Sequence, residues 1–186
     1  MDKFTKKYMA IAKAVALVEP ICWSRQIGVL IVDPSRNKII ATGYNGPPEG
    51  TPHCDEPEYL KEYLFPLLTT DDKLKLSVSC EGDMDKYVGC KTCPRRLLDI
   101  PSGERLELCS CAHAERNAIC NAGCDLHGCV AYCYCGIPCV DCTKCLINSG
   151  IIRVVCFSDP YLNMEQSVWL FKQSGVEIEL VNKDDI

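Results

Sequence analysis

The chain has 186 residues, enough for one compact domain with a hydrophobic core. Apolar residues make up 47% of it, which excludes a disordered or fibrous protein. The net charge of −5 argues against a surface built to bind long nucleic acids. No apolar run reaches the roughly 20 residues that span a membrane, and the N-terminus has no signal-peptide core, so we expect a cytoplasmic protein.

The N-terminal part predicts a helix followed by a pair of strands. Residues 4–19 carry an amphipathic stripe, and residues 27–32 form a short run rich in β-branched side chains. A turn rich in Asp, Pro and Asn then leads to a second strand over residues 38–42. The loop over residues 43–50 contains too much Gly and Pro to be regular.

Residues 51–111 differ in character from the rest of the chain. Residues 56–68 favour a helix, whereas the remainder is polar and cysteine-rich. The segment is short of large apolar residues, so we expect that it cannot form a core without a staple. It is therefore interpreted as an insertion in a single domain that spans residues 1–186.

From residue 112 onward the pattern alternates regularly between helix and strand. Together with the N-terminal elements this order predicts an α/β fold: a three-layer α/β/α sandwich around a five-stranded mixed sheet. The predicted helices cover residues 113–122, 138–149 and 164–173, and the predicted strands cover residues 129–135, 151–157 and 176–181.

Two short signatures carry the chemistry. His113-Ala-Glu115 and Pro138-Cys139-Val-Asp-Cys142 form the H-x-E and P-C-x-x-C pattern of zinc-dependent base deaminases. His113, Cys139 and Cys142 would hold Zn²⁺ and leave a fourth position open for water. Glu115 would be the catalytic residue that moves protons between that water and the base.

The position of these residues supports a catalytic rather than a structural zinc site. Cys139 and Cys142 are three residues apart at the start of a predicted helix, so they share one face and lie where thiolates are favoured. A closed structural site would need a fourth ligand. Cys145 is the alternative, but it lies a further turn along the helix, where we expect it to pack.

Several further motifs carry a family resemblance. They are Ile27-Gly-Val-Leu-Ile-Val32, Gly43-Tyr-Asn-Gly46, Pro101-Ser-Gly-Glu-Arg105 and Ser149-Gly-Ile151. With them the chain resembles the deoxycytidylate deaminases, especially the phage-type and late-competence-operon branches of the cytidine/deoxycytidylate deaminase superfamily. The resemblance implies a cytidine-deaminase-like fold, conversion of dCMP to dUMP for thymidylate synthesis, and a homo-oligomer, often a hexamer.

The same resemblance suggests how substrate is held. It implies that Asn45 hydrogen-bonds the sugar or an effector, that Arg25 pairs with the phosphate, and that Tyr161 borders the pocket. The alternatives are a turn residue, a surface arginine and a half-buried loop tyrosine. The family also implies a dCTP or dTTP effector with Mg²⁺, but the basic residue expected near the end of the helix after Glu115 is replaced by Asn121-Ala-Gly-Cys124.

The insertion is predicted to hold a second, structural zinc. By resemblance its ligands are Cys22, Cys54, Cys90 and Cys109, and four thiolates would staple a segment without a core. His53, Cys93 or Cys111 would substitute for one of them. A competing set is Cys90, Cys93, Cys109 and Cys111, and the remaining alternative is free thiols. The other cysteines are expected to be core or surface residues.

Three functions are therefore compared. A deaminase of free dCMP, or of another nucleoside or 5-substituted dCMP, fits the acidic charge balance. A deaminase of RNA or single-stranded DNA would need a basic, aromatic groove, which the chain does not suggest. A non-catalytic zinc-stapled subunit would have no need of the carboxylate at Glu115. We expect no nucleic-acid or membrane partner.

Overall fold

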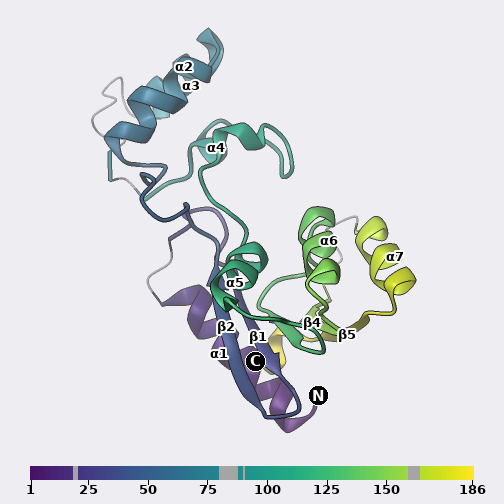
Figure 1. The fold of residues 1–186 in the computed structure, drawn as a ribbon. Coiled ribbons are helices and arrows are strands. Elements are labelled where there is room, and N and C mark those ends of the chain that lie inside the picture. Colours follow the sequence, from purple (N-terminus) through teal and green to yellow (C-terminus); the bar gives the residue numbers. More distant parts are fainter. Residues whose placement is uncertain (19–20, 80–87, 90, 159–163) are drawn as a thin grey trace. The chain divides into compact units, whose positions relative to one another are not determined.

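The computed structural model describes residues 1–18, 21–79, 88–89, 91–158 and 164–186. Contacts divide the chain into two compact units. We name them the sheet unit (Met1–Pro20, Gln26–Asn45 and His113–Ile186) and the insertion unit (Ile21–Arg25 and Gly46–Ala112). Figure 1 labels α1 to α7 and the strands β1, β2, β4 and β5. Each unit is described by itself.

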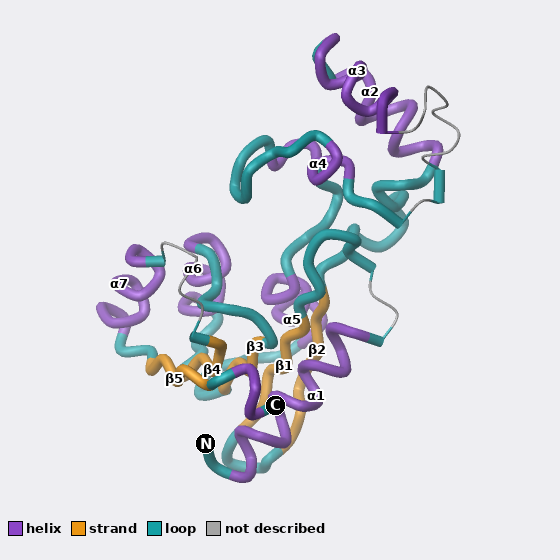
Figure 2. Tube along the Cα trace, turned by 180° about the vertical axis from the view of Figure 1, so that it is seen from behind, coloured by secondary structure: helices purple, strands orange, loops and turns teal. Residues whose placement is uncertain are grey.

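The sheet unit contains a five-stranded mixed sheet in the order β2-β1-β3-β4-β5, as predicted. β1 pairs antiparallel with β2 and β3, whereas β3, β4 and β5 run parallel. Figure 2 shows the strands in orange. The strands are β1 (Gly28–Asp33), β2 (Lys38–Tyr44), β3 (Val130–Cys133), β4 (Arg153–Phe157) and β5 (Glu177–Val181).

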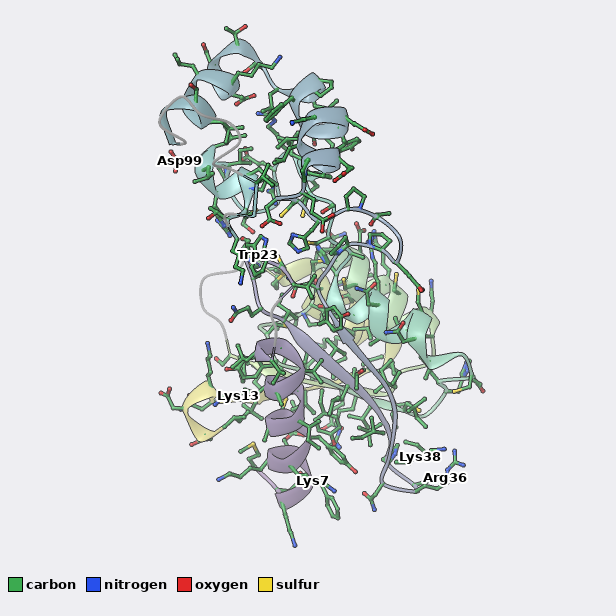
Figure 3. All side chains as sticks on the ribbon, turned by 90° about the vertical axis from the view of Figure 1, so that its left-hand side faces the viewer. Lys7, Lys13, Trp23, Arg36, Lys38 and Asp99 are labelled. Atoms are coloured by element: carbon green, nitrogen blue, oxygen red, sulfur yellow. The ribbon has the colours of Figure 1, made fainter. Side chains whose placement is uncertain are left out.

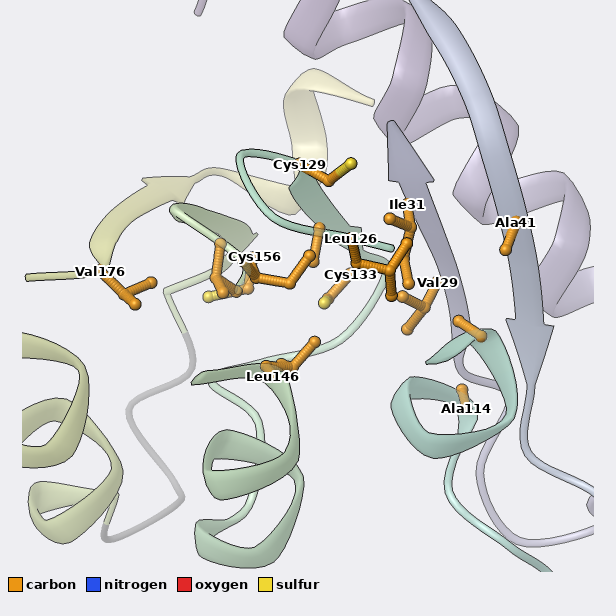
Figure 4. Packing of buried hydrophobic residues seen from close by; sticks show 14 of the residues in the cluster. Val29, Ile31, Ala41, Ala114, Leu126, Cys129, Cys133, Leu146, Cys156 and Val176 are labelled. Carbon is orange, nitrogen blue, oxygen red and sulfur yellow. The ribbon is translucent and has the colours of Figure 1, made fainter. Parts of the chain in front are cut away.

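Helices cover both faces of this sheet, which confirms the three-layer sandwich. Val29 and Ile31 pack into one apolar cluster, and the alternate residues Leu30 and Val32 pack into another, because successive side chains of a strand point to opposite faces. The first cluster, shown in Figure 4, is covered by α5 (Ala114–Ala122), α6 (Val140–Asn148) and α7 (Glu165–Ser174). The second is covered by α1 (Lys3–Leu17), and the short η4 (Lys183–Asp185) follows β5.

Two glycines let helices approach the sheet backbone. A Cβ on Gly43 would lie 2.3 Å from both the carbonyl oxygen of Ala114 and the amide nitrogen of Ala118 in α5. A Cβ on Gly28 would lie 2.2 Å from the carbonyl oxygen of Ala12 in α1. Because real Cβ contacts are not this short, each position requires glycine for steric reasons.

β3 is shorter than the predicted strand over residues 129–135. The amide of Tyr134 still donates to the carbonyl of Gly28 at 2.8 Å, but the amide of Cys135 donates to the carbonyl of Cys133 at 2.8 Å, so the backbone turns locally after Tyr134. The other helices and strands of the sheet unit agree with prediction to within two residues where the structure describes them. None of the described helices has the length and apolar character to cross a membrane.

The insertion unit differs most from expectation. The predicted helix over residues 56–68 is a π-helical segment, η1 (Tyr59–Leu64), followed by the short α2 (Phe65–Leu67). The further helices are α3 (Thr70–Ser79), α4 (Pro94–Leu97) and the 3-10 turn η3 (Leu106–Leu108). The expectation that this segment lacks a core is wrong, because an apolar cluster is buried within it: Leu60, Leu64, Leu76, Leu98 and Leu108 are each at most 3% exposed.

Candidate metal centre and active site

Two helix starts in the sheet unit bring the predicted ligands together. His113 is the N-cap residue of α5, and Cys139 is the N-cap residue of α6. His113 Nδ1 lies 3.3 Å from Cys142 Sγ and 3.4 Å from Cys139 Sγ. The three ligand atoms all lie within 4.8 Å of one another. The spacing of the two signatures therefore predicted a real cluster.

This donor set fits zinc. Zinc binds imidazole nitrogen at about 2.0 Å and thiolate sulfur at about 2.3 Å, so tetrahedral geometry places nitrogen and sulfur about 3.5 Å apart. Among the described residues, Cys145 does not join the three ligands in a compact group. Cys142 is buried whereas His113 is exposed, so the cluster is open to solvent on the imidazole side. Three ligands and an open side are typical of a catalytic site.

The thiols of this cluster are polarised towards metal binding. The hydrogen bond with Cys142, reinforced by His113, lowers the pKa of Cys139 to about 4. The same hydrogen bond raises the pKa of Cys142, and the bond to Cys139 raises the pKa of His113. One thiol is therefore ionised at neutral pH, and the thiolate is the form that zinc binds.

Glu115 lies in the first turn of α5, next to the ligands. It is only 3% exposed, and its Oε2 atom has no hydrogen-bond partner. Burial raises the pKa of this carboxyl group. Because a buried carboxylate oxygen without a partner is rare in folded proteins, this atom is available to bond a reactant.

Three thiols lie near Glu115 for which the sequence predicted only a packing role. Cys133 and Cys156 are fully buried in the apolar cluster of Figure 4, and Cys135 is packed against that cluster. Each lies close enough to Glu115 for the carboxyl group to raise its pKa further. The sequence signal was the position of Cys133 and Cys135 a few residues before Pro138. These buried thiols contribute to the low-polarity surroundings of the Glu115 carboxyl group.

The predicted substrate residues fall in different places. Asn45 is 8% exposed, and its Oδ1 accepts the amide of Ile27 at 2.9 Å. Arg25 belongs to the insertion unit, where its guanidinium donates to Ser102 Oγ at 2.8 Å. Tyr161 lies outside the described residues. Asn45 is not among the residues with a positive φ, so its place in the turn does not use the left-handed conformation.

A second group of thiols gathers in the insertion unit. Cys111 is hydrogen-bonded to both Cys22 and Cys109. These bonds lower the pKa of Cys22 and of Cys109 to about 6 and raise that of Cys111. Cys54 and Cys93 are buried near them, and burial raises the pKa of both thiols. We name these five residues the thiol cluster; Cys90 of the expected ligand set lies outside the described residues.

His53 lies beside the thiol cluster but is engaged in other contacts. His53, Cys54 and Asp55 form a compact group. His53 Nδ1 lies 2.7 Å from Asp55 Oδ1, and Nε2 contacts the carbonyl oxygen of Ile21. The ring also packs on Trp23, labelled in Figure 3, with centroids 5.0 Å apart. With both ring nitrogens engaged, His53 is a poorer ligand candidate than the thiols.

Comparisons with known proteins agree with this site. Residues 2–158 match the family model for the cytidine and deoxycytidylate deaminase zinc-binding region. A deoxycytidylate deaminase of Schizosaccharomyces pombe is 28% identical over 84% of this chain, but the match covers only 38% of that relative. A deoxycytidylate deaminase of Enterobacteria phage T2 is 30% identical over 89% of this chain and 86% of the phage protein.

A solved structure shares the fold. The dCMP deaminase of cyanophage S-TIM5, in complex with dCMP and dUMP, matches with a TM-score of 0.60 and 20% identity. The match covers 97% of this chain and 99% of the phage protein. At 20% identity this similarity supports a shared fold, whereas the evidence for the site comes from the positions of His113, Cys139, Cys142 and Glu115 in this chain.

Proposed function

Because the chain belongs to the cytidine and deoxycytidylate deaminase family, we propose that it converts dCMP and water into dUMP and ammonia. The observation that carries this proposal is the compact group of His113, Cys139 and Cys142 beside the buried carboxyl group of Glu115, whose Oε2 atom has no hydrogen-bond partner. The choice of dCMP is supported by the relatives, which are named deoxycytidylate deaminases in both fungi and phages.

In this proposal each side chain has one task. His113, Cys139 and Cys142 hold zinc, which when bound supplies a water nucleophile of lowered pKa. Glu115 accepts the proton of the attacking water at Oε2 and passes it to the ring nitrogen of the base. It then takes the second proton from the new hydroxyl group on C4 and gives it to the amine, so that the C–N bond breaks and ammonia departs as the C4 carbonyl of uracil forms. The buried thiols behind Glu115 exclude water that would compete for its protons.

Ammonia release from a panel of substrates tests the reaction. The panel contains dCMP, CMP, dCTP, deoxycytidine and 5-methyl-dCMP, together with a cytosine-bearing and an adenine-bearing oligonucleotide. We expect turnover of dCMP to exceed that of deoxycytidine by at least about 100-fold, since a phosphate contact held by a charged group contributes about 3 kcal/mol.

Each other outcome of this panel has a definite meaning. Turnover of an oligonucleotide alone would contradict the proposal and favour a polynucleotide deaminase. Faster turnover of deoxycytidine than of dCMP would contradict the choice of a nucleotide. Ammonia release from none of the substrates by zinc-loaded protein would favour a non-catalytic zinc-stapled subunit.

We further propose a structural zinc in the insertion unit, held by the thiol cluster. The expected ligands Cys22 and Cys109 are joined there by Cys111, which is hydrogen-bonded to both. We propose these three as ligands with Cys54 as the fourth, because Cys54 lies close enough to Cys22 and Cys109 for these thiols to raise its pKa. Four cysteine thiols are the donor set of many structural zinc sites. In the described residues these thiols do not yet form a compact group, so zinc binding would have to draw them together.

Metal analysis of the purified chain tests this second site. We expect two zinc ions per chain in the wild type and one each in Cys111→Ser and Cys142→Ser, since each substitution removes a ligand of a different site. Thermal melting supplies the control, because loss of a structural zinc should lower the melting temperature of Cys111→Ser. One zinc in the wild type that Cys142→Ser alone removes would contradict the second site.

Other expectations stay proposals on the same footing. They are a single deaminase domain over residues 1–186 with a zinc-stapled insertion, a homo-oligomer such as a hexamer, a cytoplasmic location, and a dCTP or dTTP effector with Mg²⁺. Asn45, Arg25 and Tyr161 remain the proposed contacts to the nucleotide. The chain matches only 38% of the length of the S. pombe relative. The substrate and the partners of the whole protein are therefore proposals, which the experiments above test.

A further inference from the structure

Two helices of the sheet unit meet at the metal centre with their N-terminal ends. His113 is the N-cap residue of α5 and Cys139 that of α6, and neither side chain bonds a backbone amide of its own helix. Because each helix start carries a partial positive charge, the approach of two starts is unfavourable by itself. Contacts between α5 and α6 are therefore needed to keep the three ligands together.

Most polar contacts between these helix starts use the reacting groups themselves. His113 Nδ1 contacts the sulfur atoms of Cys139 and Cys142, and Cys142 is hydrogen-bonded to Glu115. Metal binding changes these contacts, because a thiol loses its proton when it becomes a ligand. They therefore cannot hold the two helices in the same way before and after metal binding.

One ion pair joins the two helices without using any of these groups. Arg116 Nη2 lies 3.4 Å from Asp141 Oδ2. Arg116 directly follows Glu115 in α5, and Asp141 lies between Cys139 and Cys142 in α6. Among the ion pairs of the described residues, this is the one that connects α5 with α6. Its position next to the site makes it suited to set the distance between the helix starts.

A lysine contacts the same carboxylate from within α6 and provides an internal comparison. Lys144 Nζ lies 3.5 Å from Asp141 Oδ1. Both residues belong to α6, so their pair does not join two helices. The side chains of Arg116, Lys144 and Asp141 are 45%, 55% and 66% exposed. Both ion pairs should therefore be modest in strength and sensitive to salt.

We propose that the ion pair between Arg116 and Asp141 positions the starts of α5 and α6 for metal binding. This inference rests on the metal centre of the proposed function. It makes Arg116 and Asp141 positioning residues, since neither is proposed to touch the metal or the substrate. Contacts that orient ligands before the metal binds reduce the ordering that binding requires, and they thereby raise metal affinity.

The test compares Arg116→Gln, Asp141→Asn, the double variant and Lys144→Gln in the full chain. Lys144→Gln is the matched control, because it removes a positive charge beside the same carboxylate without breaking a contact between helices. The zinc ion to follow is the one that Cys142→Ser lacks. Its affinity is measured by chelator competition at low and at high salt, which needs no turnover of substrate.

We expect Arg116→Gln and Asp141→Asn each to weaken zinc binding by about fivefold at low salt, a size typical of a partly exposed ion pair. The double variant should be no weaker than Asp141→Asn, because either single change already breaks the pair. Lys144→Gln should bind zinc as tightly as the wild type. At high salt the differences between the variants should shrink, since salt screens exposed charges.

A simple effect of charge on Zn²⁺ would give another pattern. Loss of a positive charge, at Arg116 or Lys144, would then strengthen zinc binding, whereas loss of the negative charge at Asp141 would weaken it. Opposite signs for Arg116→Gln and Asp141→Asn, or wild-type affinity in both, would contradict the role of the pair and leave the metal centre standing. If Cys142→Ser holds as much zinc as the wild type, the metal centre itself is wrong and this inference falls with it.

Discussion

Glu115→Gln should lower the rate of dCMP deamination by about 10,000-fold while the chain keeps its zinc and its fold. Glutamine has nearly the same shape, but its amide cannot accept and return the protons that the reaction moves, and such proton transfer contributes up to about 10,000-fold. The stability of the fold should change little, because Oε2 of Glu115 has no partner to lose and the amide oxygen of glutamine can still accept the hydrogen bond that links this side chain to Cys142. Ammonia release and zinc content are measured on the same preparation.

The control is Glu165→Gln, which neutralises an exposed carboxylate on α7. It should leave both ammonia release and zinc content at wild-type levels. Glu115→Ala should lose activity as Glu115→Gln does, since neither variant carries an ionisable group at this position. If deamination survived in both variants of Glu115, another residue would move the protons and the proposed role would be wrong.

The metal cluster was predictable because its determinants are local. Cys139 and Cys142 are close in sequence, and the start of α6 places both thiols on one face. His113 comes from a distant segment, yet it too lies at a helix start, the N-cap of α5. The two motifs identify the donor atoms and place each of them at a helix start. The α/β fold then brings the starts of α5 and α6 close together.

The sheet unit was predictable for a related reason. Alternate residues of β1 enter two different apolar clusters, and the sequence shows why, because residues 27–32 form a continuous apolar run without polar positions. Burial on both faces requires helices on both faces, so the three layers follow from the pattern. What the pattern does not show is where a strand ends: after β3 the amide of Cys135 forms a local hydrogen bond to the carbonyl of Cys133, a turn that no apolar pattern indicates.

The insertion unit was not predictable in the same way. Its leucines are spread over residues 60–108 and come together only in the folded chain, so no short window shows a stripe. Thr70–Ser79 combines acidic and basic residues with few apolar ones, which hides a helix from periodicity. Asp72, near the start of this helix, is paired with Arg105 at 2.8 Å, a contact of 33 residues' separation that sequence spacing cannot indicate.

The thiol cluster likewise depends on contacts between residues that are far apart in the sequence. Sequence and resemblance named Cys22 and Cys109 as ligands, and the structure brings both into contact with Cys111.

The close approach of α5 to the sheet links the stability of the fold to the site. α5 carries Glu115 in its first turn, and its backbone lies against Gly43 of β2. Asn117 and Asn121 of the same helix donate to the carbonyl oxygens of Tyr44 and Thr42 at 2.8 and 3.0 Å. The helix is therefore held to the edge strand by side-chain hydrogen bonds on either side of a glycine contact, and its position sets that of His113.

Gly43→Ala should consequently impair both stability and activity. The added methyl group would overlap the backbone of Ala114 and Ala118, which cannot rotate away as a side chain would. We expect a loss of about 3 kcal/mol in the free energy of unfolding, the upper part of the range for overpacking, and a melting temperature lower by about 10 °C. A shift of α5 by about 1 Å should lower the deamination rate by about 100-fold and weaken zinc binding.

Gly28→Ala is the matched control, since its methyl group would overlap Ala12 in α1 on the opposite face of the sheet. It should lose a similar amount of stability, yet the chain that remains folded should keep its zinc affinity and its rate per folded molecule. Thr42→Ala, an exposed change next to Gly43, should alter neither property by much. Equal loss of activity in Gly28→Ala and Gly43→Ala would show that the site responds to overall stability rather than to the position of α5.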